Sequence, residues 1–531
     1  MAGARETLGR RSARAFSVLT LGRMASLLIG IASIVVIARM LGPDQLGVYT
    51  LAFAFYSLLW SASNFGFGVY LSKHLAEHAD SRDSGRFSSA LTVGFISVAA
   101  LGAVLALAGA GASGYAASFF GVSGADSGIF ALAAATIFFS MLYGTADYAL
   151  IGMGKNAAAI AMEVGENIVL LASSILLISM HYYASGAIAG ILVSYIVAGV
   201  AGTYFVFRVA SREMGFRFRI PKRNDFEDAF RFSLPVAASN IVGSGGALLG
   251  FAPLLLGAFV STAVLGNFQI ASKASAAISL FCMTAANAIL PTLSIALSRQ
   301  RKGGKGSGVE EVYNKTMLYS MAATVPLIVY IGVFAGPLVY VFFSPSFGSA
   351  PLYLALMAMG TIIGLLGMYA TTLFTAVGKT SRLFYYTSIA MVVQVVALLI
   401  LTPFWKAEGN IFAVFFIGSV ATDYLLIRDA RITLKVRTRY GKLLRMFAAN
   451  AALAAVLALG LLLPNLLVEL AYGLVAAAAV YPPLLALSGA VDGEDVRLLS
   501  KAVGGLPGLG AVAGPAMWYL GFFVRRAEGV F

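Results

Sequence analysis

The sequence has few charged residues and almost no cysteine, and both shortages exclude whole classes of protein. Only 11% of its 531 residues are charged, whereas about 25% are charged in an average soluble domain. The single cysteine, Cys282, rules out a disulfide within the chain. Because 60% of the residues are hydrophobic, a water-soluble fold could not bury so much apolar surface. The composition therefore indicates a protein embedded in a membrane.

What the sequence does contain is a series of long apolar stretches. Continuous apolar runs of about 20 residues are typical of transmembrane helices, whereas the strands of a membrane barrel alternate polar and apolar residues. We therefore predict an all-α polytopic membrane protein with about 14 transmembrane helices. The predicted spans cover residues 17–38, 46–72, 88–110, 128–151, 158–180, 184–207, 230–258, 263–297, 316–342, 351–376, 383–402, 410–430, 443–463 and 466–489.

Basic residues gather in every second loop between these spans, beginning with residues 5–14 and ending with residues 428–445. The intervening loops, such as 111–127 and 343–350, carry almost no Lys or Arg. By the positive-inside rule the basic loops face the cytoplasm, so we expect a plasma-membrane protein with both termini inside. The net charge of +14 is then explained by contact with anionic lipid headgroups, and nucleic-acid binding is not needed to account for it.

Two short segments recur at nearly the same distance along the chain. Residues 46–49, Leu-Gly-Val-Tyr, are matched by 265–268, and the turn at 152–155 is matched by 376–379. Nearly equal offsets predict a duplication of six spans about an axis along the membrane normal. We expect pseudo-symmetric six-helix bundles at residues 1–225 and 226–440, an added transmembrane helix pair at 441–490, and a cytoplasmic or interfacial tail at 491–531.

Basic residues inside the predicted spans are candidate site residues, because a charge near the bilayer centre costs about 2.5–3.5 kcal/mol on insertion scales. Arg23 lies in the first span, and Lys273 lies in the eighth with Gln269 one turn before it and Asn287 further along. Two cations from opposite bundles facing one cavity would suit an anionic phosphate or diphosphate; alternatively, each neutralises a buried carboxylate. Arg39, at the outer end of the first span, is either an interfacial anchor or a ligand. Arg23 shares a polar and small helical face with Thr20, Ser26, Gly30 and Ser33.

Carboxylates are the second group of intramembrane candidates. Asp147 lies in the fourth span, and Glu163, Glu166 and Asn167 share one face of the fifth. Such carboxylates could bind a coupling proton or Na⁺, or they could form structural pairs with Lys155 or with the arginine of the first span. No other cofactor and no metal site are expected.

Three further features are given no site role. His74-Leu75-Ala76-Glu77-His78 matches a zinc-peptidase pattern but lies in a charged loop without a further ligand. Asp423 and Glu469 lie close to the ends of spans 12 and 14, and we expect both to be solvated.

The exit of the first span carries the sharpest motif of the chain. Residues 38–49 read Ala-Arg-Met-Leu-Gly-Pro-Asp-Gln-Leu-Gly-Val-Tyr. This segment resembles the ARxLGPxxxGxY opening of polysaccharide flippases, which belong to the multidrug/oligosaccharidyl-lipid/polysaccharide exporter superfamily. The stretch 64–68 and the pair Gly378-Lys379 also look like that family's pattern.

The resemblance implies a flippase, not an enzyme, that moves a polyprenyl-phosphate- or diphosphate-linked oligosaccharide from the inner to the outer leaflet by alternating access. Its implied partners are that lipid-linked substrate, the bilayer and glycan-assembly enzymes. In the related lipid II flippases, spans 1 and 8 contribute basic residues to the cavity, and spans 13 and 14 form a groove for the lipid tail. The resemblance thus implies that role for Arg23 and Lys273, which lie in the same spans.

Two alternative functions remain open at the level of the sequence. A cation-coupled drug exporter of the same superfamily shares the topology, although that branch tends to have twelve spans. A membrane-embedded glycosyltransferase or polymerase is the other alternative, but such enzymes generally need a sizeable external loop with catalytic residues. The longest outer loop here, 111–127, has Asp126 as its only charged residue.

The tail contains one more apolar segment, residues 505–524, which is rich in glycine and contains Pro507 and Pro515. Such a composition makes a poor isolated helix. A span here would also place the two arginines that follow on the outer side, against the charge bias of the other loops. We therefore expect an interfacial segment on the cytoplasmic side. Its expected anchors are Trp518, Tyr519, Phe522 and Phe523.

Overall fold

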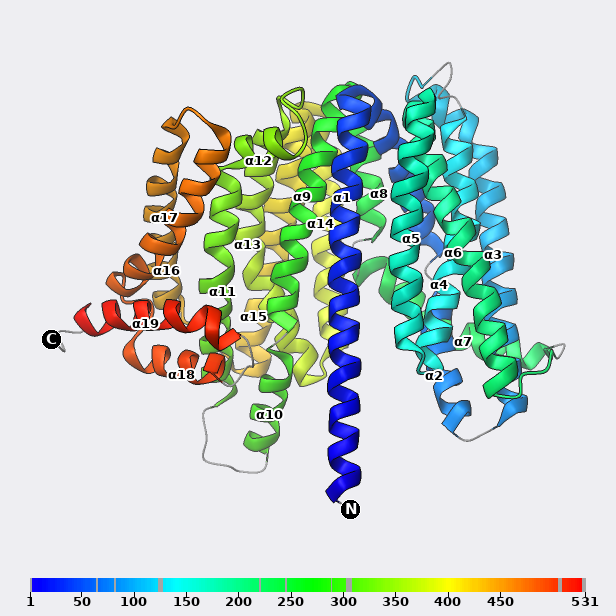
Figure 1. Ribbon diagram of the computed structural model, residues 1–531, viewed down its shortest axis with the longest axis horizontal. Coiled ribbons are helices and arrows are strands. Elements are labelled where there is room, and N and C mark those ends of the chain that lie inside the picture. The colour runs from blue at the N-terminus through cyan, green and yellow to red at the C-terminus, as the bar shows by residue number, and fades with distance from the viewer. Residues whose placement is uncertain are drawn as a thin grey trace. The chain divides into compact units, whose positions relative to one another are not determined.

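The computed structural model describes residues 2–63, 65–80, 83–122, 128–218, 221–243, 246–287, 289–301, 308–504 and 509–527. Every regular element in these ranges is a helix, as predicted (Figure 1). The chain forms two compact units, residues 1–266 and 267–531, which we describe separately. Their boundary falls in the first turns of one helix, well beyond residue 225, where the sequence predicts that the first bundle ends. The predicted domain boundaries stay a prediction.

The first unit consists of long helices that pack side by side. Its helices are α1 Ala2–Ser63, α2 Phe67–Asp80, α3 Ser84–Phe119, α4 Ile129–Gly152, α5 Asn156–Leu177, the π-helical turn η2 Ile178–Tyr182, α6 Tyr183–Glu213, α7 Arg223–Gly243 and α8 Gly246–Gly257. Helix α4 packs against α3, α6 and α2, and α5 packs against α6 and α1. Helices α7 and α8 cover the described parts of the predicted span 230–258.

The second unit begins within α9 and contains all later helices. They are α9 Thr262–Asn287, α10 Leu290–Arg301, α11 Val309–Val333, α12 Ala335–Phe342, α13 Ala350–Val377, α14 Thr380–Ile411, η3 Phe412–Ile417, α15 Gly418–Asp429, η4 Ala430–Leu434, α16 Tyr440–Ala458, η5 Leu459–Leu462, α17 Leu466–Leu487, α18 Gly493–Gly504 and α19 Leu509–Ala527. Helix α13 is central, since it packs against α11, α14 and α15.

Ten helical segments in the described residues are long and apolar enough to cross a membrane. Three of them each hold two predicted spans: Met24–Ser63, Asn156–Glu213 and Thr380–Leu434. The predicted seventh span is not among the ten, and residues 244 and 245 within it lie outside the described residues. The chain is thus a multi-pass membrane protein, and the number fourteen stays a prediction.

Sharp backbone breaks separate the spans that share a segment. Gly42, at φ 69°, interrupts α1 within the motif at the exit of the first predicted span. His181, at φ 65°, breaks the chain between α5 and α6, and Lys406, at φ 49°, breaks α14 at an offset close to that of the repeated segments. Positive φ is uncommon for residues other than glycine. The breaks at His181 and Lys406 therefore occupy matching places in the predicted duplication.

The predicted start of one outer loop is wrong. The sequence predicts an outer loop at residues 111–127, but α3 continues past residue 110 to Phe119. The extra turns are rich in alanine, a strong helix former, and this helix propensity outweighs the effect of the interspersed glycines. Residues 123–127, including Asp126, lie outside the described residues.

The C-terminal helices divide into two orientations. Helices α16 and α17 form an antiparallel pair, whereas α18 and α19 run across their ends (Figure 1). The α19 helix packs on α17, and Tyr519 donates a hydrogen bond of 3.1 Å to the Ala479 carbonyl. Trp518 is 68% exposed on the other side of α19. Of the four expected anchors, Tyr519 therefore contacts α17, whereas Trp518 faces away from the protein.

Candidate functional site

The first unit contains a polar cluster between α1 and α5. The Ser26 hydroxyl donates a 2.9 Å hydrogen bond to Glu163 Oε1 and accepts one of 3.0 Å from Asn167 Nδ2. The amide of Asn167 also donates to the Glu163 carbonyl. Asn167 lies close to Gly30, so two members of the predicted polar face of the first span do meet α5. The sequence pattern therefore identified the correct helical face.

The second acidic residue of α5 turns toward α6 instead. Glu166 Oε1 accepts a hydrogen bond of 2.9 Å from Ser194, which is buried. The sequence predicts Glu163 and Glu166 on one helical face, yet they reach different neighbours because α5 lies between α1 and α6. The two carboxylates thereby connect three membrane helices.

Tyrosine residues gather the acids into one region. The Tyr143 hydroxyl lies within electrostatic range of Asp147, Glu163 and Glu166. The Tyr143 ring packs against Tyr195, with ring centroids 5.6 Å apart. Tyr143 therefore lies near all three carboxylates that the sequence gives as coupling candidates. The tyrosines were missed because an aromatic residue in a membrane helix carries no distinctive sequence signal.

The expected structural pair between Lys155 and a carboxylate of this cluster is not found. Lys155 instead bonds Glu213 at the end of α6, at 2.6 Å to Oε2 and 2.8 Å to Oε1. The side chain of Arg23 lies outside the described residues, so pairing with Arg23 stays a prediction. Arg39 is exposed near the Gly42 break.

Chemically, the cluster offers carboxylate, amide and hydroxyl oxygens. Such oxygens suit a proton or a hard cation such as Na⁺. No group of three acidic, histidine or cysteine residues within the described part of the chain could hold a metal ion.

The predicted residues of the second unit lie along α9. Gln269 is buried, and its Nε2 has no hydrogen-bond partner among the described residues. Lys273 follows one turn later and is half-buried, whereas Asn287 at the end of α9 is exposed. Of this group, Gln269 is the best placed to bind a ligand, because it is a buried amide with an unused donor.

Two carboxylates that the sequence predicts in solvent are buried. Asp423 and Glu469 are each 8% exposed. The prediction was wrong because it took a position close to the end of a span as exposed to solvent, whereas both residues are covered in the folded structure. Asp423 lies under α13, and Glu469 begins α17 within the added helix pair.

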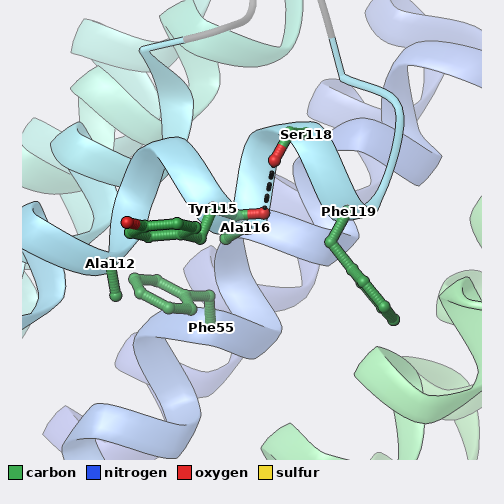
Figure 2. Close-up of a pocket in the computed structure, with 6 residues that line it drawn as sticks. All are labelled: Phe55, Ala112, Tyr115, Ala116, Ser118 and Phe119. Carbon is green, nitrogen blue, oxygen red and sulfur yellow. Dashed lines mark hydrogen bonds between the residues drawn. The ribbon is translucent and has the colours of Figure 1, made fainter.

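An aromatic hollow of about 570 Å³ lies between α1 and the end of α3. In Figure 2 the rings of Tyr115 and Phe55 face each other, and Phe119 points away from them. The Ser118 hydroxyl bonds the Tyr115 carbonyl at 3.0 Å. Aromatic side chains at the end of a membrane helix are typical of the belt at the membrane–water interface. None of the predicted site residues lines this hollow.

Solved structures place the fold in a known class of membrane transporters. The lipid II flippase MurJ in an inward closed conformation matches with a TM-score of 0.69 and 14% identity, over 86% of this chain and 96% of its own. An inward-facing multidrug resistance MATE transporter of the MOP superfamily matches with a TM-score of 0.65 and 17% identity, over 77% of this chain and 94% of its own. A MOP transporter from Pyrococcus furiosus has a TM-score of 0.54 and 17% identity, over 79% and 94% of the two chains. These likenesses define the fold as that of the MOP superfamily.

The family follows from the sequence of the first half. Residues 12–297, more than half of the chain, match the model of the polysaccharide biosynthesis protein family. No curated protein sequence matches the chain. The chain therefore belongs to the polysaccharide biosynthesis protein family.

Proposed function

We propose that this protein is a flippase that moves a polyprenyl-phosphate- or diphosphate-linked oligosaccharide from the inner to the outer leaflet of the plasma membrane. The observation that carries the proposal is membership of the polysaccharide biosynthesis family on a MOP transporter fold. The likeness to the lipid II flippase covers more of this chain than the likeness to the MATE transporter does. Movement by alternating access would expose one cavity to each side in turn.

Recognition of the phosphate is assigned to basic residues. We propose that Arg23 and Lys273 bind the anionic phosphate group, that Gln269 and Asn287 contact it or the adjacent sugar, and that Arg39 acts at the outer end. A guanidinium binds phosphate in a bidentate manner, and an ammonium binds it as a point charge. The half-buried position of Lys273 supports this role, since a cation within a membrane helix is costly unless it has a function.

Coupling to an ion gradient is assigned to Asp147, Glu163 and Glu166. The hydrogen bonds of Ser26 and Ser194 position two of these carboxylates, and Tyr143 lies within range of all three. Binding of a proton or Na⁺ would neutralise the cluster and change how α1, α5 and α6 pack. No further cofactor is proposed.

The test is flipping by purified protein in liposomes that contain a polyprenyl-diphosphate oligosaccharide with a fluorescent sugar. A membrane-impermeant quencher reports the fraction that reaches the outer leaflet. Arg23→Ala and Lys273→Ala should each reduce the rate at least about tenfold, which corresponds to about 1.4 kcal/mol of lost interaction. Lys379→Ala, in a loop that joins α13 to α14, is the matched control and should keep the rate. Unchanged rates in both site variants would refute the substrate assignment.

A cation-coupled exporter of small molecules is the second candidate, and the likeness to the MATE transporter favours it. Export of a fluorescent organic cation from cells that make the protein would distinguish the two functions. Cation export together with no flipping in liposomes would favour the exporter.

A further inference from the structure

A carboxyl group outside the proposed site is buried between two helices of the second unit. Asp423 lies on α15, and only 8% of the residue is exposed. Its Oδ1 makes no hydrogen bond of ordinary geometry with a described residue. The Gly367 backbone is the polar group that faces the carboxyl group, and it carries no positive charge. An ionised carboxylate without a paired cation is costly in a low-dielectric interior, so such a group either binds a cation or accepts a proton.

The opposite wall of this site is helix backbone. Gly360, Gly364 and Gly367 lie on one face of α13, at helical spacings. A Cβ added at these positions would meet Phe415, Ser419 and Asp423, respectively. Small residues let membrane helices approach closely. At Gly367 the α13 backbone therefore closes directly over the carboxyl group, and no side chain separates them.

The charged groups on the neighbouring helices α14 and η4 form no ion pair with Asp423 among the described residues. Arg382 on α14 binds Asp429, which lies further along α15 than Asp423, at 2.8 Å. Lys406 and Glu408 lie near the far end of α14, and Arg431 on η4 is exposed.

The remaining titratable groups near Asp423 are phenols. Tyr313 on α11 lies within electrostatic range of Asp423 and of Tyr369 on α13. A phenol stays neutral at physiological pH and brings no positive charge. Thr422, the neighbour of Asp423 on α15, donates its hydroxyl to the Gly418 carbonyl. None of these groups neutralises an ionised Asp423.

We propose that Asp423 is a proton-binding site at the interface of α13 and α15. A bound metal cation would need several oxygen ligands around the carboxylate, and the close approach of Gly367 leaves no space for them on that side. A proton needs no space. When the helices part, an oxygen of the carboxylate takes a proton from water; when they close, the group is a neutral carboxylic acid. Its use as a coupling proton rests on the proposed flippase function, whereas the proton binding does not.

The experiment is an infrared pH titration of the purified full-length protein in detergent, from mildly acidic to mildly alkaline pH. The C=O stretch of a protonated carboxyl group is distinct from the bands of a carboxylate. Wild type should show such a band that disappears as the pH rises, and Asp423→Asn should lose the part of that titrating signal that Asp423 contributes, whereas any contribution from the carboxylates of the first unit should remain. Glu469→Gln, at another buried carboxyl group of the second unit, is the control and should keep the Asp423 contribution.

Each alternative outcome overturns the proposal. A band that does not change with pH means that Asp423 is a permanently protonated structural group. A titrating band of full size in Asp423→Asn means that another residue binds the proton. If Asp423→Asn does not fold, the same titration is carried out on Gly367→Ala. This variant retains the carboxyl group and places a methyl group against it. An unchanged titration midpoint in that variant would contradict a site closed by the α13 backbone. Flipping is not measured, so this result is independent of the proposed function.

Discussion

At the level of single residues, small and hydroxyl side chains decide how polar groups meet in a membrane interior. Ser26 both donates to Glu163 and accepts from Asn167, so one hydroxyl satisfies two partners on the next helix. Glycine contributes because it has no side chain. At Gly190 the α6 backbone can therefore approach the backbone of Ser174 on α5. Hydrogen bonds and close backbone approach are the main forces between helices in lipid, where hydrophobic burial does not distinguish protein from solvent.

A methyl group at that glycine should therefore destabilise the first unit. An alanine Cβ at Gly190 would overlap backbone atoms of Ser174, which cannot rotate away. Gly190→Ala should lower the free energy of unfolding by about 1–3 kcal/mol, as overpacking does in other proteins. Thermal unfolding in detergent measures the change. Gly111→Ala is the control, because nothing lies within 4 Å of its Cβ, and equal losses in both variants would contradict the packing argument.

At the level of helices and turns, each predicted six-span repeat contains an ion pair near its end. The pair joins the last helix of the repeat to a residue at or just after the turn that precedes its fifth span. Lys155 pairs with Glu213 in the first half, and Arg382 pairs with Asp429 in the second. The pairs differ in burial: the Glu213 side chain is 47% exposed, whereas that of Asp429 is 6% exposed. Their contributions to stability should differ accordingly, since an exposed pair is screened by water.

Removing the buried Asp429 carboxylate should lower the free energy of unfolding more than removing the exposed Glu213 carboxylate. Asp429→Ala leaves both Arg382 and Thr433 without their shared acceptor, and hydrogen bonds to charged groups contribute about 1.5–3 kcal/mol. Glu213→Ala should cost about 0–1 kcal/mol. Both values come from the same unfolding assay. A larger loss in Glu213→Ala would show that burial does not set the order.

The cross-running helix α18 is fixed at its N-terminus by a reciprocal cap. Asp492 Oδ1 accepts from the Asp495 backbone N–H, and Asp495 Oδ2 accepts from that of Asp492. Lys442 at the start of α16 binds both carboxylates, at 2.8 and 2.9 Å, and Tyr319 donates to Asp495. Because Asp495 is buried, removing its cation leaves an unpaired charge inside the protein.

Lys442→Met should therefore release α18, whereas Lys315→Met should not. Lys315 binds Glu494, whose side chain is 73% exposed and regains water when the pair is lost. Limited proteolysis between residues 490 and 510 should accelerate at least about tenfold in Lys442→Met, as expected for a loss of about 1.4 kcal/mol. Equal rates in the two variants would mean that the salt bridges do not hold the helix.

Acidification should release the same helix. Burial by itself raises the pKa of Asp492, but hydrogen bonds from Lys442 and the Asp495 backbone outweigh it and hold the pKa below its usual value. A carboxyl group with a depressed pKa stabilises the fold above its unfolded-state pKa, near 4, and this stabilisation is lost as the pH falls through the folded-state value. A spin label on α18 should therefore become more mobile only below about pH 4. Release nearer neutral pH would contradict this assignment.

At the level of the complete chain, we expect the basic loops and the tail to determine the orientation of the protein in the bilayer. Within the part of the chain that the structure describes, α19 is not one of the helices long and apolar enough to span a membrane, and it runs across the ends of α16 and α17 (Figure 1). Its exposed Trp518 stacks with Phe522, and exposed arginines follow at 525 and 526. Aromatic and basic residues on one surface suit the interface of an anionic membrane.

The predicted topology places the C-terminus in the cytoplasm. A cysteine added after residue 531, in a Cys282→Ala background, should resist a membrane-impermeant thiol reagent in intact cells and react fully after lysis. A cysteine at Gly348, in a predicted outer loop, is the positive control and should react in intact cells. Labelling of the C-terminal cysteine before lysis would show that the tail crosses the membrane.

Composition and the apolar pattern along the chain were enough to predict the membrane class and the all-helical fold, and the motif at residues 38–49 indicated the family, because these properties act locally. They also identified which carboxylates lie in membrane helices, since a charge is conspicuous in any apolar span. The folded arrangement was needed to show that Glu163 and Glu166 reach different helices, and that Asp423 is buried rather than solvated. Burial and pairing depend on which helices become neighbours, and that choice rests on contacts such as Gly367 against Asp423, between residues far apart in the sequence.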